Sequence, residues 1–429
     1  MKHCLALLFA AALVAQTPPP SLSPSDSSPD GEELAGNRSG ETNVNSRYTV
    51  ESVNVDNQHR YFISKSILED MHHLVGARFN SESFQNLAER ISSELHGYRV
   101  VFKLARGADP DHVRVTFVIE GPTSGLDVEF PKALYNSRQG FTAEGDAVFT
   151  AGANRFLFGA LTNNDDLPER FAGIRARYER MSLGSERVHL SFEFDAYHAD
   201  SMPASQSAAL AQGDTSLLYR SYRNFEPMIT IALAGPLTWA GGISFQQFDP
   251  QFTAAHTESA NAVINTLRFE RRWEGSANYK HRLEAGYNLR AATSFLGADY
   301  VYTRHTVHAH YSLKHGRQCA DVSFLGGDIT GRAPLFERFV LGNSSTLRGW
   351  NMYDIDPLGG TKVVHGSVGY GYRIVRVFYD TGAVWDGGSH PAARSSAGVG
   401  IKVEGILLAV AFPIRNDRVE PVFIAGMSF

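Results

Sequence analysis

Residues 188–195 read Val-His-Leu-Ser-Phe-Glu-Phe-Asp, so that apolar and polar residues occupy successive positions. Successive side chains of a β-strand point to opposite faces. The apolar residues from Val188 to Phe194 would therefore share one face, and the polar residues would share the other. Residues 172–179 and 307–314 repeat the pattern. It predicts strands that place one face in an apolar medium and the other in water.

Alternating stretches of about ten residues fill residues 122–429, where no capped segment of helical period is convincing. A soluble β-sandwich would show the same alternation. The length favours a barrel, because roughly 300 residues supply about sixteen strands with turns, and bacterial barrels have an even number. No apolar run reaches the roughly 18 residues of a membrane helix. We therefore predict a transmembrane β-barrel of about sixteen antiparallel strands.

The composition agrees with a barrel and bears on partners. The chain has 27 Phe and 17 Tyr, yet its mean hydropathy is −0.21. A membrane barrel combines these properties because its apolar residues are dispersed by alternation. The net charge of −5, without a long basic run, argues against a nucleic-acid partner.

The first 46 residues predict an export signal and a linker. Residues 1–15 have a short basic start, an apolar stretch too short to span a membrane, and a small residue at Ala15. These features indicate a secretory signal peptide. Residues 16–46 are rich in Pro, Ser, Asp and Asn, and we expect disorder there. After cleavage only Cys319 would remain, which excludes an intramolecular disulfide.

Residues 47–121 predict a small α+β domain. A strand at 48–55 is followed by a helix that Ser64 can cap and by a second helix that Ser81 can cap, and both carry apolar residues at helical spacing. Two alternating strands follow, near 100–104 and 113–119. This order resembles a POTRA domain, the periplasmic module of outer-membrane assembly factors.

The most specific pattern lies between residues 336 and 386. It comprises Leu347-Arg348-Gly349-Trp350, then Gly359-Gly360, then Phe378, Asp380 and Gly382 in Phe-x-Asp-x-Gly. In order and spacing it resembles the superfamily of BamA, TamA and two-partner transporters. Members carry a long loop with a hydrophobic-Arg-Gly-aromatic tetrapeptide. The terminal Phe429 resembles the strand signal that bacterial barrel assembly reads.

The resemblance implies that the long loop folds into the barrel lumen, where its arginine meets acidic side chains of the wall. Strand phase agrees, because Val375, Val377 and Tyr379 suit lipid while Asp380 takes the lumen phase. Asp380 is therefore the predicted partner of Arg348, and a carboxylate can hold a guanidinium bidentately. The family's second acceptor, a glutamate, is replaced by Gly369. Either Asp380 holds the arginine alone or another carboxylate substitutes.

The resemblance further implies an outer-membrane protein with a periplasmic N-terminal domain. It would insert or translocate unfolded outer-membrane or secreted proteins through a wall that opens sideways. Contacts with outer-membrane lipid follow, and periplasmic accessory proteins are expected to be few. The alternative is a passive pore or a structural barrel, and the third possibility is a dedicated two-partner-type exporter.

The sequence offers little to support an enzyme. It has no Gly-x-Ser-x-Gly elbow and no Cys/His metal spacing. His308 and His310 lie two apart in the lumen phase, where they are expected to line a wet channel. We predict no enzymatic activity, no cofactor and no metal.

Overall fold

The computed structural model describes residues 48–55, 63–94, 99–120, 125–183, 187–252, 257–275, 279–403, 405–415 and 419–428. The predicted signal peptide and linker, and the terminal Phe429, lie outside them. Among the described residues, no helix is both long enough and apolar enough to cross a membrane.

The N-terminal region is a three-stranded sheet with two helices. Its elements, in chain order, are β1 (Thr49–Val55), α1 (Lys65–Leu74), α2 (Ser81–Glu94), β2 (Arg99–Arg106) and β3 (His112–Glu120). The strand order is β1-β3-β2, with β1 parallel and β2 antiparallel to β3. The Ser64 side chain accepts a hydrogen bond from the Ile67 amide and begins α1. The predicted order of elements, strand-helix-helix-strand-strand, is confirmed, and it is consistent with a POTRA-like domain.

The apolar stripes of the two helices meet the apolar face of this sheet. Ile67 of α1 and Phe84 of α2 are buried, as is Phe117 of β3. The Phe84 ring centroid lies 5.9 Å from that of Phe102 and 6.2 Å from that of Phe117. Aromatic contacts at these distances add to the stabilisation that burial supplies.

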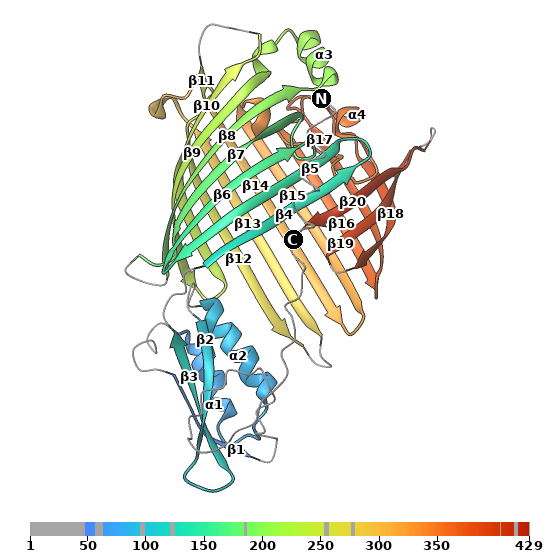
Figure 1. The fold of residues 1–429 in the computed structure, drawn as a ribbon. Helices are drawn as coiled ribbons and strands as arrows, with labels where there is room; N and C mark the ends of the chain where they lie inside the picture. Colours follow the sequence, from blue (N-terminus) through green and yellow to red (C-terminus); the bar gives the residue numbers. More distant parts are fainter. Residues whose placement is uncertain are drawn as a thin grey trace, which may run out of the picture. The chain divides into compact units, whose positions relative to one another are not determined.

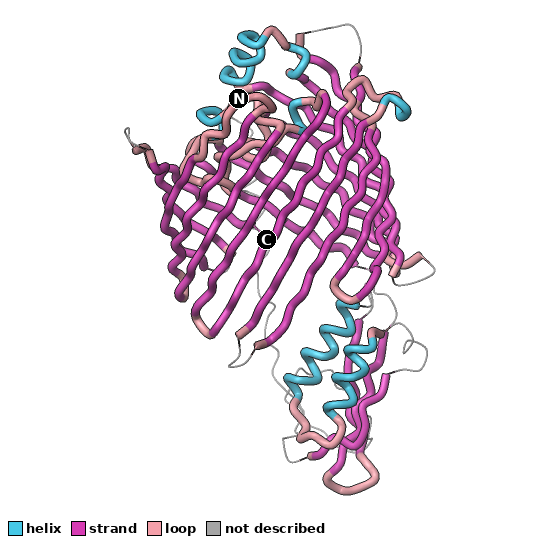
Figure 2. The backbone as a smooth tube through the Cα atoms, turned by 180° about the vertical axis from the view of Figure 1, so that it is seen from behind, coloured by secondary structure: helices cyan, strands magenta, loops and turns pink. Residues whose placement is uncertain are grey.

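The remainder of the chain closes into an antiparallel barrel (Figures 1 and 2). Its strands are β4 (Gly125–Asn136), β5 (Gly140–Ala151), β6 (Asn154–Asn163), β7 (Glu169–Arg180), β8 (Val188–Ser201), β9 (Tyr219–Ala234), β10 (Leu237–Pro250), β12 (Ala262–Glu274), β13 (Lys280–Ala292), β14 (Tyr302–His315), β15 (Gln318–Gly331), β16 (Lys362–Tyr372), β17 (Val375–Trp385), β18 (Arg394–Val403), β19 (Ile406–Ile414) and β20 (Val422–Ser428). The two-residue β11 (Glu258–Ser259) pairs with β10 just before β12. The barrel thus has sixteen strands, as predicted.

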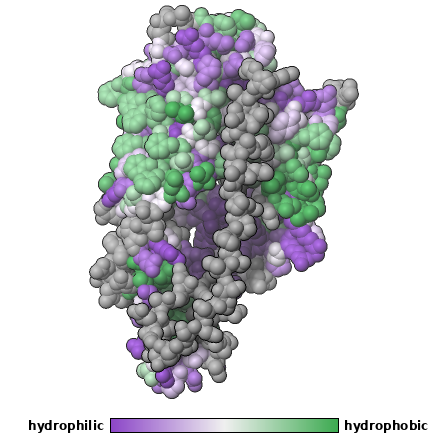
Figure 3. Space-filling model, viewed as in Figure 1, coloured by the Kyte–Doolittle hydropathy of each residue, from purple (hydrophilic) through white to green (hydrophobic). Residues whose placement is uncertain are grey.

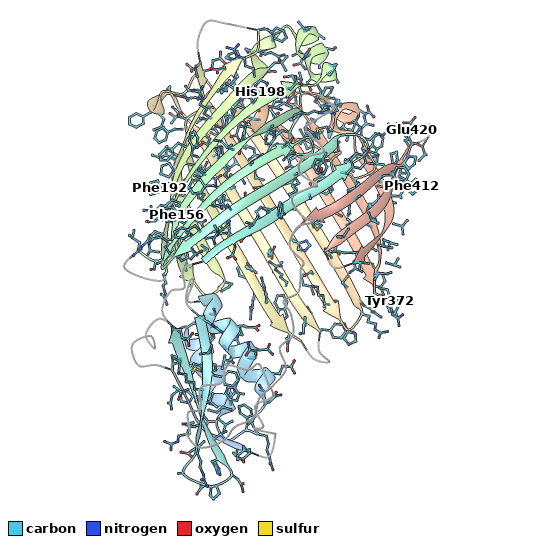
Figure 4. The ribbon with its side chains drawn as sticks, in the orientation of Figure 1. Phe156, Phe192, His198, Tyr372, Phe412 and Glu420 are labelled. Carbon is cyan, nitrogen blue, oxygen red and sulfur yellow. The ribbon has the colours of Figure 1, made fainter. Side chains whose placement is uncertain are left out.

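The barrel strands have an apolar outer face and a largely polar inner face, although β20 places the buried Val422 and Ile424 inward. Val364 and Val368 of β16 are exposed on the outside, whereas Ser367 between them is buried. Green hydrophobic residues cover parts of the outer wall in Figure 3. The labelled Phe156 and Phe192 point outward in Figure 4. This division is expected of a wall with lipid on one side and polar groups on the other.

The two ends of the barrel differ in their connections. One end has short turns, such as Gly316-Arg317 between β14 and β15 and Arg373-Ile374 between β16 and β17. The other end carries the long connections, including α3 (Pro203–Gln212) and the segment from 332 to 361 (Figure 1). In outer-membrane barrels the short turns are periplasmic and the long loops are extracellular.

Candidate functional site

The longest connection, residues 332–361 between β15 and β16, is here called the lumen loop. It contains the short helices η5 (Leu335–Glu337) and α4 (Met352–Ile355). The backbones of Phe339 and Gly360 exchange two hydrogen bonds of 2.9 and 2.8 Å, which close the neck of the loop. Leu335, Leu341 and Leu347 are fully buried. The loop is therefore a packed part of the barrel interior.

Arg348 of the lumen loop is bound by Asp380, at the centre of β17. Its Nε donates to Asp380 Oδ2 at 2.9 Å, and its Nη2 donates to Oδ1 at 2.7 Å. The Arg348 backbone amide also donates to Oδ2, at 3.1 Å. The Asp380 side chain is fully buried. A carboxylate that accepts two parallel guanidinium bonds fixes the orientation of the loop as well as its position.

Neutral groups complete the surroundings of this ion pair. Ser367 Oγ accepts from Arg348 Nη2 at 3.0 Å and donates to Asp380 Oδ1 at 2.7 Å. Ser396 Oγ donates to Asp380 Oδ2 at 3.3 Å. The Arg348 Cζ atom lies 3.5 Å from the Phe378 ring centroid, a cation–π contact. The carboxylate accepts five hydrogen bonds in total, which offsets the cost of burying its charge.

The other residues of the tetrapeptide fit tightly against the wall. A Cβ atom on Gly349 would lie 2.6 Å from the Phe412 carbonyl carbon and 2.8 Å from the Pro413 nitrogen, so only glycine fits. Leu347 has a φ of 42°, one of two positive values among the described non-glycine residues. Trp350 donates from Nε1 to the Ser395 carbonyl at 2.8 Å. The tetrapeptide therefore meets β19 and β18 as well as β17.

The glycines of the motif permit close backbone approach near the neck and the wall. Gly359 has a φ of +62°, which favours glycine. A Cβ on Gly360 would lie 2.7 Å from the Trp385 backbone, and a Cβ on Gly382 would lie 2.7 Å from the Val364 carbonyl oxygen. At these glycines the backbones of the loop and the wall approach too closely to leave room for a side chain.

The space beside Gly369 is filled by a side chain of the neighbouring strand β15. A Cβ at this position would contact all three outer atoms of the Asp321 carboxyl group, with Oδ1 and Cγ at 2.8 Å. Asp321 on β15 is the register partner of Gly369. A carboxylate therefore does lie at the place of the missing glutamate. Among the described residues, however, the ion pair of Arg348 is made with Asp380.

The lumen loop has a second ionic attachment of opposite sign, which the sequence did not reveal. Glu337 is buried, and its Oε1 lies 3.4 Å from Arg290 Nη1 on β13. Its Oε2 lies 3.8 Å from Arg304 Nε on β14. Gln246 Nε2 donates to Oε1 at 3.1 Å. The sequence did hold one indication of this contact. Glu337 stands among the apolar Leu335, Phe336 and Phe339, and an acidic residue that is buried with such neighbours seldom lacks a basic partner.

Loops from the start of the barrel hold the lumen loop as well. Asp165, between β6 and β7, accepts from the Ser344 amide at 3.2 Å and from Ser344 Oγ at 3.0 Å. Gln139 Nε2 donates to the Gly342 carbonyl at 2.5 Å. Burial raises the pKa of the Asp165 carboxyl group, and the neighbouring Asp166 charge adds to the rise. The hydrogen bonds from Ser344 oppose it.

A third ion pair fixes the neck. Arg338 Nη2 lies 2.7 Å from both carboxylate oxygens of Asp386. The same arginine donates to the carbonyls of Leu358 and Gly359, each at 2.8 Å. The lumen loop is thus attached at its neck, at Glu337, at Ser344 and at Arg348.

A polar cavity of about 280 Å³ lies within the barrel, beside the Glu337 attachment. Its lining includes Glu193, Asp195, Tyr222, Glu226 and Arg290. The described residues contain no group of three or more metal-ligating side chains, and His308 and His310 belong to none. The cavity can hold water or a polar segment beside the lumen loop.

Comparison with known proteins agrees with this arrangement. Residues 267–416, which include the lumen loop and β17, match the Omp85 superfamily domain. BamA from Haemophilus ducreyi, in a structure that lacks POTRA domains 1–3, superposes with a TM-score of 0.57 at 13% identity. The match covers 89% of this chain and 85% of that one.

Two CdiB structures are similar in fold. CdiB from Escherichia coli gives a TM-score of 0.50 at 12% identity, covering 90% of this chain and 77% of the other. CdiB from Acinetobacter baumannii gives 0.50 at 11% identity, covering 99% and 96%. A comparison with curated protein sequences gives no match.

The fold and site define a class, an outer-membrane β-barrel whose lumen holds a long loop fixed by an arginine–aspartate pair. Residues 267–416 match the Omp85 superfamily domain, and the fold is similar to that of BamA and CdiB. The resemblance predicted from the tetrapeptide, the paired glycines and the Phe-x-Asp-x-Gly strand is thereby confirmed. A barrel of this type resides in the outer membrane.

Proposed function

We propose that this chain inserts polypeptides into the outer membrane or moves them across it, through a barrel wall that opens between β20 and β4. The proposed action is conformational rather than enzymatic. Strand exchange at the wall needs only the making and breaking of backbone hydrogen bonds. No cofactor or metal is part of the proposal.

The observation that carries this proposal is the short seam. β20 and β4 pair over five residues, 424–428 against 136–132. In contrast, β13 and β14 pair over thirteen, 280–292 against 314–302. A short ladder has fewer hydrogen bonds to break. The seam is therefore a place where the wall can part at low cost.

The part of β4 that precedes the seam has a strand edge without a partner on β20. Its residues 125–129 pair with β5, whereas the register with β20 begins only at Lys132. Leu126, Val128 and Phe130 on this part of β4 are more than 60% exposed. An exposed strand edge with apolar side chains can accept a further strand by backbone pairing. The binding partner that suits this edge is an incoming polypeptide in extended form.

The N-terminal domain fits the same role. Its strand β2 pairs with β3 on one side, which leaves an outer edge. We propose that this domain lies in the periplasm and receives unfolded clients by strand addition. One such domain offers little surface for accessory proteins, so we propose few of them. Lipid is the constant partner of the outer wall.

A disulfide across the seam tests the proposal. Ala133 of β4 and Met427 of β20 are register partners, so Ala133→Cys with Met427→Cys can form a cross-strand disulfide. Cys4 and Cys319 are replaced by serine in the same chain. The matched control joins Ala285→Cys and Ala309→Cys, register partners on the fully paired β13 and β14.

Oxidation of the seam variant is expected to abolish client handling, reduction to restore it, and the control to stay active in both states. The readout is quantitative proteomics of the outer membrane and the medium. Loss of many barrels indicates an insertase, and loss of one or two secreted proteins indicates a dedicated exporter. Full activity with the seam cross-linked contradicts the proposal. Loss of solute uptake alone would indicate a passive pore.

A further inference from the structure

A cavity lined by cations lies at the short-turn end of the barrel. Its volume is about 620 Å³, and it is bounded by the β14–β15 and β16–β17 turns. Four basic side chains line it, namely Lys314, Arg317, Arg373 and Arg376. Gln318, Cys319 and Ile374 are among the remaining lining residues, and no carboxylate is.

Several basic residues inside the barrel have acidic partners. Arg175 pairs with Glu144 and Asp195, and Arg290 pairs with Glu226. Within the described part of the chain, no ion pair involves the four lining cations. Like charges gathered without counter-charges repel one another. An arrangement of this kind is stabilised when an anion enters it.

The fold holds the two turns together. The Arg373 amide donates to the Arg317 carbonyl at 2.8 Å. Arg376 Nη1 donates to the carbonyls of Arg373 and Val375 at 2.9 and 3.0 Å, which turns its guanidinium back over the second turn. Arg373 has a φ of 54°, a conformation that is costly for a side chain of this size. Backbone contacts and conformation therefore position Arg373 and Arg376.

The cavity comes near the lipid face at Arg373, whereas its lining residues Cys319 and Arg376 are in the lumen phase. Tyr372 ends β16 on the outer wall, where it points outward at the short-turn end (Figure 4). The Arg373 Cζ atom lies 5.7 Å from the Tyr372 ring centroid. On the neighbouring turns, the rings of Tyr279 and His315 stack at 4.2 Å. Amphipathic aromatic residues mark the level of lipid headgroups.

We propose that this cavity binds the phosphate headgroup of an anionic phospholipid from the periplasmic leaflet. Arg317 and Arg373 would contact the phosphate, since guanidinium groups bind phosphate through paired donors. The half-exposed Ile374 and Tyr372 would contact the start of the acyl chains. These two apolar contacts favour a lipid over an acidic peptide. The proposal does not depend on which clients the barrel handles.

Cys319 supplies the test, because it lines the cavity and is the one cysteine of the described chain. With Cys4 replaced by serine, its alkylation by a maleimide is followed in neutral detergent. Phosphatidylglycerol is expected to slow the reaction, whereas phosphatidylcholine is not. The double variant Arg317→Gln with Arg373→Gln should need a phosphatidylglycerol concentration roughly thirtyfold higher to protect Cys319 to the same extent.

The matched control is Arg180→Gln with Arg272→Gln, which removes the same charge from the same end. Arg180 already donates to Ser182 and Asn154, and Arg272 to Glu270. This control should keep the protection of Cys319. Equal protection by phosphatidylcholine, or retained protection in the Arg317/Arg373 variant, overturns the proposal. So does protection by inorganic phosphate or a glutamate-rich peptide where phosphatidylglycerol gives none.

A second measurement applies if no lipid changes the alkylation rate. Native mass spectrometry then counts the phosphatidylglycerol molecules retained by the protein. One fewer retained molecule in the Arg317/Arg373 variant than in the Arg180/Arg272 control supports the site. Equal numbers in the two variants overturn it.

Discussion

Glu337 and Arg348 carry opposite charges on the same loop, and each is bound by side chains of the opposite sign. The wall arginines Arg290 and Arg304 flank Glu337, whereas Asp380 holds Arg348. A loop with both attachments resists displacement in more than one direction. Moving the lumen loop away from the wall must break at least one buried ionic contact, which is costly unless the freed charge reaches water.

Removing the carboxylate of Asp380 should release the tip of the lumen loop. Asp380→Ala leaves the Arg348 guanidinium in a partly buried place without its counter-charge. The free energy of unfolding is expected to fall by about 3–5 kcal/mol. Urea titration of the folded barrel in lipid measures this loss. Conductance across a planar bilayer should rise in parallel, because the displaced tip no longer blocks the lumen.

The control for this variant is Asp328→Ala. Asp328 pairs with Lys362 where β15 and β16 meet the lumen loop, but both side chains are more than one-third exposed. An exposed pair is worth about 1 kcal/mol or less. An Asp380 variant that loses no more stability than the Asp328 variant would show that the buried pair does not hold the loop.

Replacing Glu337 tests the second attachment. Glu337→Ala leaves Arg304 without its counter-charge, while Arg290 keeps Glu226. We expect a loss of about 3 kcal/mol, at the lower end for a broken buried pair. The matched control is Glu337→Gln, which keeps the shape and can still accept from Gln246. A smaller loss in the glutamine variant is expected, and equal losses in both would point to packing rather than charge.

Strand phase was sufficient to place Asp380 in the lumen, because side chains on a strand alternate with a fixed period. The same reasoning placed Gly369 in the lumen but could not reveal Asp321 beside it, since that contact depends on the register of β15 against β16. Glu337 was missed for a related reason. Its partners lie on β13 and β14, and an irregular loop has no periodicity from which to infer a direction.

The pairing of Gly369 with Asp321 leads to a reciprocal prediction. Gly369→Glu restores the residue type of the family, yet its side chain would collide with the Asp321 carboxyl group. Crowding typically costs about 1–3 kcal/mol, and the like charges add to the cost. Unfolding in urea should show this loss. Adding Asp321→Gly, which moves the carboxylate from β15 to β16, should recover most of it.

Failure of the double variant to recover would show that the backbone, and not the carboxylate, excludes a side chain at position 369. Gly366→Ala on the same strand is the matched control. A Cβ there meets nothing nearer than 3.9 Å. That variant should be close to neutral with or without Asp321→Gly.

The Asp165 attachment predicts a pH dependence of a definite sign. Burial raises the pKa of Asp165 above its usual 3.8. Between 3.8 and the raised value, the unfolded chain has lost this proton while the folded chain keeps it. The contribution of Asp165 to stability therefore falls as the pH rises through this interval, and above it the contribution stays at the lower level.

Asp165→Asn removes the titrating group while its amide oxygen can still accept from the Ser344 amide. Urea unfolding of both proteins across pH 4 to 7 isolates the contribution, since every other group titrates in both. The stability of the wild-type chain should fall relative to that of the variant as the pH rises. A constant difference would mean that Asp165 titrates normally. A rise would mean that the hydrogen bonds from Ser344 outweigh burial and favour the charged carboxylate.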